Sequence, residues 1–376
     1  MANTFQFLIN NNPVEASFYD ELISLEVEEN VDLPGAIQIM LPVSRTDKGD
    51  LTQVNSDRFK PFSNLAIVVG VEGETNECIF DGYVLTHKLH LETGVTASNL
   101  SVWGQDAAWL MNLEEKTREW VDVSDASVAN TIFKNYGITP SADNTEDDSP
   151  AHTEDGYTLM QRASDIQFIR NLASRNGKLC RVACTSTPGK RIGYFAKPKL
   201  DGKPVVTFKP NETETWNVRA LDFSWDVSRP IAVKTSQALF NDPSEDGISA
   251  NTQDSGLTLL GDRSLLDFAG KPMTMLLSTN VDSAGELRSR AQSSLQESGW
   301  FVRCEGEADV SRLKTILRVN TIVQIEGVGS LNSGKYYVWS VRHSITADAH
   351  KMRFVLVRNA VGATPGSGDG ILGGLR

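Results

Sequence analysis

The chain has 376 residues, of which 40% are hydrophobic and 22% charged, and this composition is typical of a soluble globular protein with two or three domains. Its formal net charge of −12 argues against wrapping nucleic acid, because that binding needs a basic surface to displace counterions. No apolar run approaches the roughly 20 residues that cross a bilayer, and the N-terminus lacks a signal-peptide pattern, so we expect synthesis and assembly in the cytoplasm.

The first region alternates apolar and polar residues over short runs, as half-buried strands do. Residues 25–39 read LEVEENVDLPGAIQI, and residues 82–107 read as one strand, a polar turn and a second strand. A closed sheet removes exposed strand edges, so we expect residues 1–114 to form a small closed or nearly closed β-barrel.

The middle region changes to the apolar period of a helix. A first helix is predicted before Gly137, and a second helical region is predicted over 158–177, with Asp165 capping its later half. Two strands follow around a Pro-Gly turn, so we expect residues 115–215 to form a mixed α+β domain. The residues expected on the inward helical faces are Val128, Ile132, Phe133, Phe168, Ile169 and Leu172.

The last region returns to the strand pattern and resembles the first one. At an offset of 196, residues 25–39 align with residues 221–235, and at an offset of 254, Ala66–Ala107 aligns with Asn320–Val361 without a gap. Few of these positions are identical, so the inference rests on matched polarity and on the same order of blocks. The positions that define the repeat are Pro34, Gly73 and Tyr83 in the first copy and Pro230, Gly327 and Tyr337 in the second. The alternative is that unrelated hairpins share this alternation.

The second copy carries extra sequence, which we place at 236–319 as a polar loop and a helix. The helix is indicated by Ala284, Leu287, Ala291 and Leu295, with Ser283 as a candidate N-cap. We expect a second β-barrel over 216–361 and a flexible Gly-rich tail over 362–376. The predicted fold class is α+β, mostly β, with two related small barrels flanking a mixed domain.

The sequence contains none of the common catalytic motifs. Cys180 and Cys184 lie four residues apart, but no histidine near them in the sequence could complete a zinc site. His87, His90 and His343 lie in the two matching hairpins, and we expect them at a surface or an interface. We therefore predict no catalytic, cofactor-binding or metal-ligating residue and no cofactor.

Three stretches resemble the phage late control D family. Residues 327–345, GVGSLNSGKYYVWSVRHSI, are similar to the family's Gly-rich loop and Tyr-x-Val-x-x-Val-x-His strand. Residues 163–177 resemble the helix of its central domain, and the helix before residues 301–309 is placed as in the family. The resemblance covers about 1–361, and the family includes hub parts of contractile phage tails, tailocins, type VI spike proteins and extracellular contractile injection systems.

This resemblance implies a non-enzymatic baseplate hub, a homotrimer whose six barrels adapt a hexameric inner tube to a trimeric spike. The implied partners are the inner tube protein, a separate spike protein and baseplate wedge or sheath-side proteins, without a nucleic-acid-binding surface or membrane insertion. The chain would reside in the baseplate of a phage tail or an injection particle. The alternatives are a tail-associated cell-wall hydrolase, a monomeric module that binds a glycan or peptide, and a tip protein of a long non-contractile tail.

Overall fold

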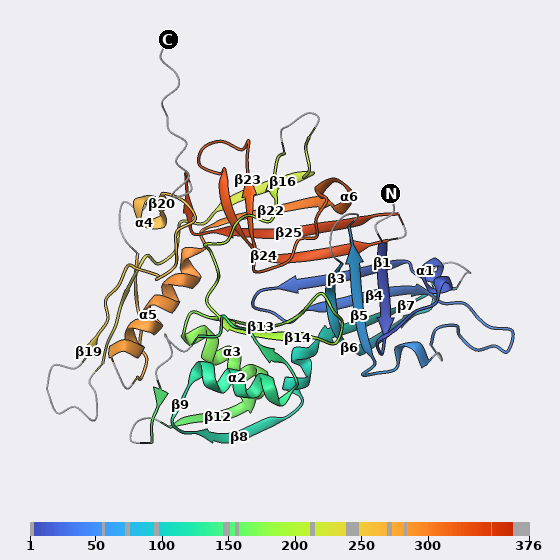
Figure 1. Cartoon of the computed structure of the whole chain (residues 1–376), viewed down its shortest axis with the longest axis horizontal. Coiled ribbons are helices and arrows are strands. Elements are labelled where there is room, and N and C mark those ends of the chain that lie inside the picture. The colour runs from blue at the N-terminus through green and yellow to red at the C-terminus, as the bar shows by residue number, and fades with distance from the viewer. Residues whose placement is uncertain are drawn as a thin grey trace, which may run out of the picture.

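The structure, a computed structural model, describes residues 4–54, 57–71, 76–93, 98–145, 151–154, 158–210, 215–237, 248–268, 273–281, 284–346 and 348–363. One sheet of 13 strands dominates the molecule and contains strands from both ends of the chain (Figure 1). Helices α2 (Asp125–Asn135) and α3 (Asp165–Arg175) lie together below this sheet in Figure 1, and the longer helix α5 (Ala284–Gly299) lies to its left. The fold is therefore α+β and mostly β, as predicted.

The first region consists of short strands in which buried and more exposed positions alternate. Leu25 and Val27 are fully buried, whereas Glu26 and Glu28, which alternate with them, are partly exposed on the opposite face of the same strand. The elements of this region are β1 (Thr4–Ile9), β2 (Asn12–Pro13), α1 (Ala16–Glu21), β3 (Ser24–Asn30), β4 (Ala36–Pro42), η1 (Asp57–Phe59), β5 (Asn64–Gly70), β6 (Glu77–His90), β7 (Asn99–Asp106) and η2 (Ala107–Asn112).

The middle region packs α2 and α3 against short strands, and all six residues expected on the inward helical faces are buried. The Ser124 hydroxyl accepts the Ser127 N–H at the start of α2, which is a normal N-cap. Two predictions for the second helix are wrong. Leu159–Ser164 pairs with β8 as a strand, and Asp165 accepts a hydrogen bond from Lys116 instead of capping the helix. The other elements are β8 (Glu115–Trp120), β9 (Val123–Ser124), β10 (Thr139–Pro140), β11 (Ala151–His152), β12 (Leu159–Ser164), β13 (Leu179–Cys184) and β14 (Arg191–Ala196).

The last region contains a second set of long strands together with an added segment. Leu287, Ala291 and Leu295 of the predicted helix are buried in α5, Ala284 is exposed, and Ser283 lies outside the described residues. The other elements are β15 (Thr207–Phe208), β16 (Ala220–Trp225), β17 (Ala232–Lys234), β18 (Ser236–Gln237), β19 (Ile248–Ser249), β20 (Arg263–Ser264), α4 (Leu265–Phe268), β21 (Thr274–Leu276), β22 (Val302–Asp309), α6 (Val310–Leu313), β23 (Ile322–Ile325), β24 (Gly334–Ile345), β25 (His350–Arg358) and β26 (Ala360–Val361).

The repeat is visible in the strand pairing. The order β3-β4-β7-β6-β5 in the first copy matches the order β16-β22-β25-β24-β23 in the second, with every neighbouring pair antiparallel. The hairpin strands β6 and β24 also share a register shift, directly after Val84 and directly after Val338. Tyr83 and Tyr337 each precede that shift in the same position.

The pairing corrects two details of the sequence alignment. The offset of 254 relates β6 to β24, but β7 and β25 differ by 252, because the second hairpin has a turn that is two residues shorter. The counterpart of β4 is β22, so the added segment lies between β16 and β22 and ends before Val302 instead of at residue 319. The residues after Pro230 leave the repeat, since β17 pairs with β21 in a separate sheet and packs under α5.

The expectation of two separate barrels is not confirmed. Among the described residues the strand pairs follow an open path, and the two halves share one sheet because β24 pairs with β3. The strand β23 has four residues and β24 has twelve, so β23 covers only Gly334–Tyr337. The remaining edge, from Ser340 to Ile345, is covered by β3 of the other half, as the neighbouring red and blue strands of Figure 1 show.

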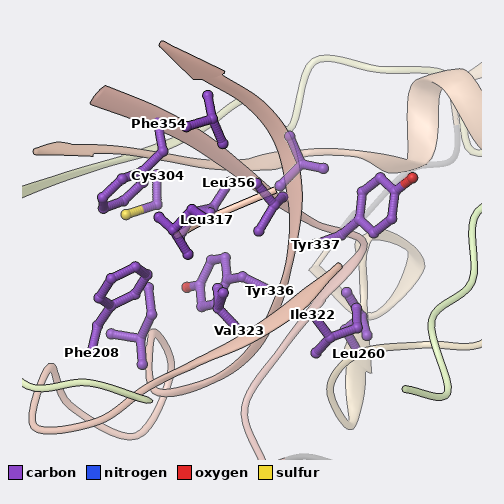
Figure 2. Close-up of a cluster of buried hydrophobic side chains, with 14 of the residues drawn as sticks. Phe208, Leu260, Cys304, Leu317, Ile322, Val323, Tyr336, Tyr337, Phe354 and Leu356 are labelled. Carbon is purple, nitrogen blue, oxygen red and sulfur yellow. The ribbon is translucent and has the colours of Figure 1, made fainter. Parts of the chain in front are cut away.

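The three largest hydrophobic clusters among the described residues correspond to the three regions of the chain. One lies under the first half of the sheet, one lies in the middle region, and the largest lies under the second half. Figure 2 shows part of the largest cluster, in which the rings of Phe208 and Phe354 stack at 4.9 Å. Val31 belongs to the second-half cluster and Ile345 to the first-half cluster, so the junction itself is packed. The boundaries at 114/115 and 215/216 stay predictions.

Candidate assembly surface

One face of the large sheet turns its side chains away from the hydrophobic clusters and carries charged residues. On β3 and β24 these residues include Glu28 and Arg342, whose carboxylate and guanidinium lie 2.6 Å apart across the strand pair. On β22 and β25, Glu307 accepts hydrogen bonds from Arg353 at 3.0 Å and from Arg219 at 3.1 Å. We call this surface the polar face; opposite charges alternate along it.

A groove of about 600 Å³ follows the polar face across the junction of the two halves. Its walls include Glu28, Arg342, Asp222, Arg303 and Glu307, which come from both copies of the repeat. Hydrogen bonding to Arg353 holds the pKa of Glu307 below its usual value, and hydrogen bonding to Glu28 raises the pKa of Arg342. These groups stay charged near neutral pH, so the groove suits recognition of polar partners better than proton transfer.

Two strand edges at the ends of the repeats pair with no strand among the described residues. The second half of β6, from Thr86 to His90, pairs with β7 on one side only. The strand β16 pairs with β22 on one side only. An edge of this kind presents backbone N–H and C=O groups that can pair with another strand. Leu89 and Leu91 also expose 38% and 56% of their surfaces beside the first edge.

Behind the polar face, Arg318 joins all three regions of the chain. Its guanidinium donates to both oxygens of Glu29 on β3, at 2.8 Å each, and to Glu77 at the start of β6, also at 2.8 Å. It also lies 3.8 Å from the Cys184 Sγ atom on β13 of the middle region. Burial alone would lower the pKa of Arg318, but Glu29 and Glu77 hold that pKa above its usual value.

Two histidines meet at the same junction. The His343 Nδ1 and His350 Nε2 atoms lie 3.0 Å apart, and both side chains are buried. The expectation that His343 lies at a surface or an interface is therefore corrected, because its side chain is fully buried where β24 pairs with β3. Burial lowers the pKa of His350 to about 4 and lowers that of His343 well below its ordinary value. His87 and His90, by contrast, are exposed on β6.

The middle region is fixed to the first half by a buried ion pair. Arg191 on β14 donates to Asp81 on β6 at 2.7 Å, and the Gly189 N–H donates to the same carboxylate, also at 2.7 Å. Arg191 further donates to the Tyr83 hydroxyl at 3.1 Å. Because Asp81 is 4% exposed, this contact is shielded from solvent and holds the two regions in one orientation.

The residues proposed to define the repeat lie at several places in the fold. Pro34 lies in the turn between β3 and β4, and Pro230 lies after β16, where the chain leaves the repeat. Gly327 lies in the turn after β23 with φ of +77°, a conformation that favours glycine. The Tyr337 hydroxyl donates to Asn320 at 2.8 Å. Gly73 lies outside the described residues.

The described residues contain no group of three or more His, Cys, Asp or Glu side chains that could hold a metal ion. Cys180 is fully buried, and burial raises the pKa of its thiol to about 12. Cys184 donates instead to the Cys78 carbonyl at 2.6 Å. No helix among the described residues is long and apolar enough to span a membrane.

Sequence reasoning missed three features of this surface, namely the pairing of β24 with β3, the open edges and the position of Arg318. Strand pairing between distant segments leaves no local pattern that can be read along the chain. One signal was present, because Leu89 and Leu91 sit where the second copy has His343 and Ile345. These substitutions indicate that the two repeats differ in burial at these positions, but they do not indicate which strand causes the difference.

A protein-family model described as Alg8 N-terminal domain matches residues 2–347. No curated protein matches the chain in sequence. Among solved structures, the chain is similar to the 43 kDa tail protein of prophage MuSo2 from Shewanella oneidensis, with a TM-score of 0.68 and 14% identity over 96% of this chain and 100% of that one. A tail protein from Neisseria meningitidis MC58 gives a TM-score of 0.65 and 11% identity, over 96% and 98% of the two chains.

A third similar structure is a type VI secretion system component from E. coli, described as similar in structure to T4 bacteriophage tail proteins. It gives a TM-score of 0.55 and 12% identity, and the match covers 92% of this chain and 76% of that one. Identities this low show a shared fold. The resemblance to the late control D family is not confirmed by these matches and stays a prediction.

Proposed function

Because the chain belongs to the family described as Alg8 N-terminal domain and shares its fold with phage tail proteins, we propose that it is a structural component of a contractile tail or injection particle, the baseplate hub. Three copies form the hub. Their six repeat units match a hexameric inner tube at one end, and the threefold arrangement of whole chains matches a trimeric spike at the other.

One observation carries this proposal. The two copies have the same strand order and join edge to edge in a single sheet through β24 and β3. A repeat unit that pairs edge to edge with the other copy in its own chain can pair in the same way with units of further chains, arranged around a symmetry axis. Closed rings of identical chains bury matching surfaces without leaving open ends. Three chains then supply the six similar units that a sixfold partner requires.

The contacts at the junctions support a mechanical role. Arg318 ties β3 and β6 to the segment that precedes β23, and the Arg191–Asp81 pair fixes the middle region to β6. Bidentate hydrogen bonds between an arginine and a carboxylate fix the relative orientation of the groups that they join. The hub can therefore transmit force along its axis without bending between its regions. Its proposed neighbours are the inner tube protein, a separate spike protein and baseplate wedge or sheath-side proteins.

The polar face is the proposed lining of the axial channel, because the opposite face of the sheet is occupied by the hydrophobic clusters. The carboxylates on the polar face are paired with arginines, and the lowered pKa of Glu307 keeps that group ionised. An ionised, paired carboxylate is a poor general acid, which favours a hub over the alternative of a cell-wall hydrolase. We propose a structural component without catalytic activity, made and assembled in the cytoplasm.

The test is the mass of the purified chain in solution, measured by light scattering over a concentration series. We expect a species of three times the 41.2 kDa of one chain, and its share should rise with concentration. A monomer at every concentration would contradict the hub and favour a binding module that acts alone. Assay of the same sample on peptidoglycan gives the matching control, and we expect no hydrolysis.

A further inference from the structure

The two halves of the large sheet are joined by one strand pairing, and the equivalent strands at the two ends of the repeats are not paired in this way. Within the chain, the second half of β24 pairs with β3. In the repeat, β6 is the counterpart of β24, and β16 is the counterpart of β3. Among the described residues, neither the second half of β6 nor the outer edge of β16 has such a partner strand. Each chain thus carries the two strand edges, on β6 and on β16, that a second pairing of this kind requires.

We propose that the β6 edge of one protomer pairs antiparallel with the β16 edge of a second copy, in the register of β24 with β3. This inference extends the proposed hub by naming the surface that joins its chains. Transferring the register by the repeat offsets of 254 and 196 fixes every pair. The pairs are Thr86 with Asp226, His87 with Trp225, Lys88 with Ser224, Leu89 with Phe223, His90 with Asp222 and Leu91 with Leu221.

The two edges lie far apart in the strand order of the sheet, and they do not pair with each other within the described chain. The backbone on both sides supports the transfer. The Phe62 N–H donates to the Val84 carbonyl at 2.8 Å, just as the Asn320 N–H donates to the Val338 carbonyl at 3.1 Å. The backbone just before the open edge of β6 therefore has the same hydrogen bonding as the backbone just before the part of β24 that pairs with β3.

The exposed fractions of equivalent residues show how much apolar surface the pairing would remove from water. At the internal junction, where β24 pairs with β3, His343 and Ile345 of β24 are 0% and 2% exposed. Their counterparts are Leu89 on β6 and Leu91 directly after β6, which expose 38% and 56%. These two leucines lie on the side of the sheet that faces the hydrophobic clusters, where Leu221 and Phe223 of β16 also lie. Pairing the edges would bury apolar surface that one chain leaves in water.

Charge favours the same register. At the internal junction Arg342 pairs with Glu28 at 2.6 Å. On the open edge, Lys88 replaces Arg342, and the register places it opposite Ser224, between Asp222 and Asp226. Cationic or protonatable side chains thus lie on the β6 edge and carboxylates on the β16 edge. Opposite charges across neighbouring strands stabilise a pair, and two β6 edges facing each other would instead repel.

The contact joins different surfaces of two copies, so it runs head to tail. Such contacts build rings when the rotation closes and do not stop at a pair of chains. In a ring of three, contacts within a chain alternate with contacts between chains, and all six are of the same kind. Every open strand edge named above is then covered.

Disulfide cross-linking tests the register. We would make the variant Lys88→Cys/Ser224→Cys, oxidise it with diamide and analyse it on a denaturing gel. The pair Glu28→Cys/Arg342→Cys is the matched control, because it occupies the same register inside one chain and should lose its added thiols without changing mass. The unmodified chain controls for its four natural cysteines. We expect the double variant to run as covalent dimers and trimers, and each single variant as a monomer.

Two further results separate this proposal from the hub itself. The variant Lys88→Cys/Phe223→Cys is shifted by one residue, which places the two thiols on opposite faces, so it should not cross-link. If light scattering shows a trimer and the intrachain control forms, absence of the Lys88–Ser224 cross-link would overturn the register and leave the hub standing. Dimers from a single variant would overturn the head-to-tail contact. A chain that is monomeric before oxidation would contradict both proposals.

Discussion

Replacing Arg318 with methionine is expected to lower the free energy of unfolding by about 3 kcal/mol, because removing one partner of a buried ion pair leaves the other charge buried and unpaired. Arg318 exposes 17% of its side chain and Glu29 exposes 10%, and three hydrogen bonds link the guanidinium to Glu29 and Glu77. Methionine preserves most of the packing volume but leaves both carboxylates without their cation. Chemical denaturation followed by tryptophan fluorescence measures the change.

The chain offers a matched control on the other face of the same sheet. Arg342 pairs with Glu28 at 2.6 Å, but these side chains are 51% and 39% exposed. Arg342→Met should therefore cost less than about 1 kcal/mol. Adding Glu29→Gln to Arg318→Met should recover part of the loss, since it removes one stranded charge. Equal effects of Arg318→Met and Arg342→Met would show that Arg318 does not hold the regions together.

Acidification is expected to destabilise the chain through His343 and His350. Their folded pKa values lie below the ordinary value of 6.5, with that of His350 at about 4, so the unfolded chain binds protons first as the pH falls. Stability is therefore lost from about pH 6.5 down to pH 4. The shift of His350 alone corresponds to roughly 3 kcal/mol over that window. The charged groups that face this pair are Glu29, Arg318 and Asp309.

The measurement compares denaturation curves of the natural chain and of His343→Gln/His350→Gln at pH 7 and pH 4. The comparison is needed because burial raises the pKa of Asp106 to about 6, which adds stability on acidification and acts in the opposite direction. The natural chain should lose at least about 3 kcal/mol more than the variant over this range. An equal loss in both proteins would mean that the histidine pair does not titrate as its burial requires.

Local patterns were enough to predict much of the fold. The inward positions of α2 and α3 and the buried spacing of α5 follow from helical period, and the alternation around Leu25 and Val27 follows from the strand period. The repeat was also detectable, since β3 and β16 keep the offset of 196 and β6 and β24 keep that of 254. Its second strands could not be aligned correctly, because a turn that is two residues shorter changes the register without changing the polarity pattern.

The assembly surface depended on information that the sequence does not carry locally. The edge of β24 from Ser340 to Ile345 could pair with a strand of its own half or with β3 of the other half. Which of these occurs depends on how far β23 extends along β24. Arg318 was not noticed because its partners, Glu29 and Glu77, are about 240 or more positions away. For the same reason His343 was expected at a surface or an interface, although it is buried where β24 pairs with β3. Residues near in the fold but distant in the chain leave no periodic signal.

The central claim is that three chains present six similar units in one ring. The most direct test is particle imaging of the purified assembly, with averages viewed down the axis. We expect a ring of six lobes that alternate in size, because only the second copy of each pair carries α5 and its added segment. Separate particles of two lobes, or rings with a number of lobes other than six, would contradict the account.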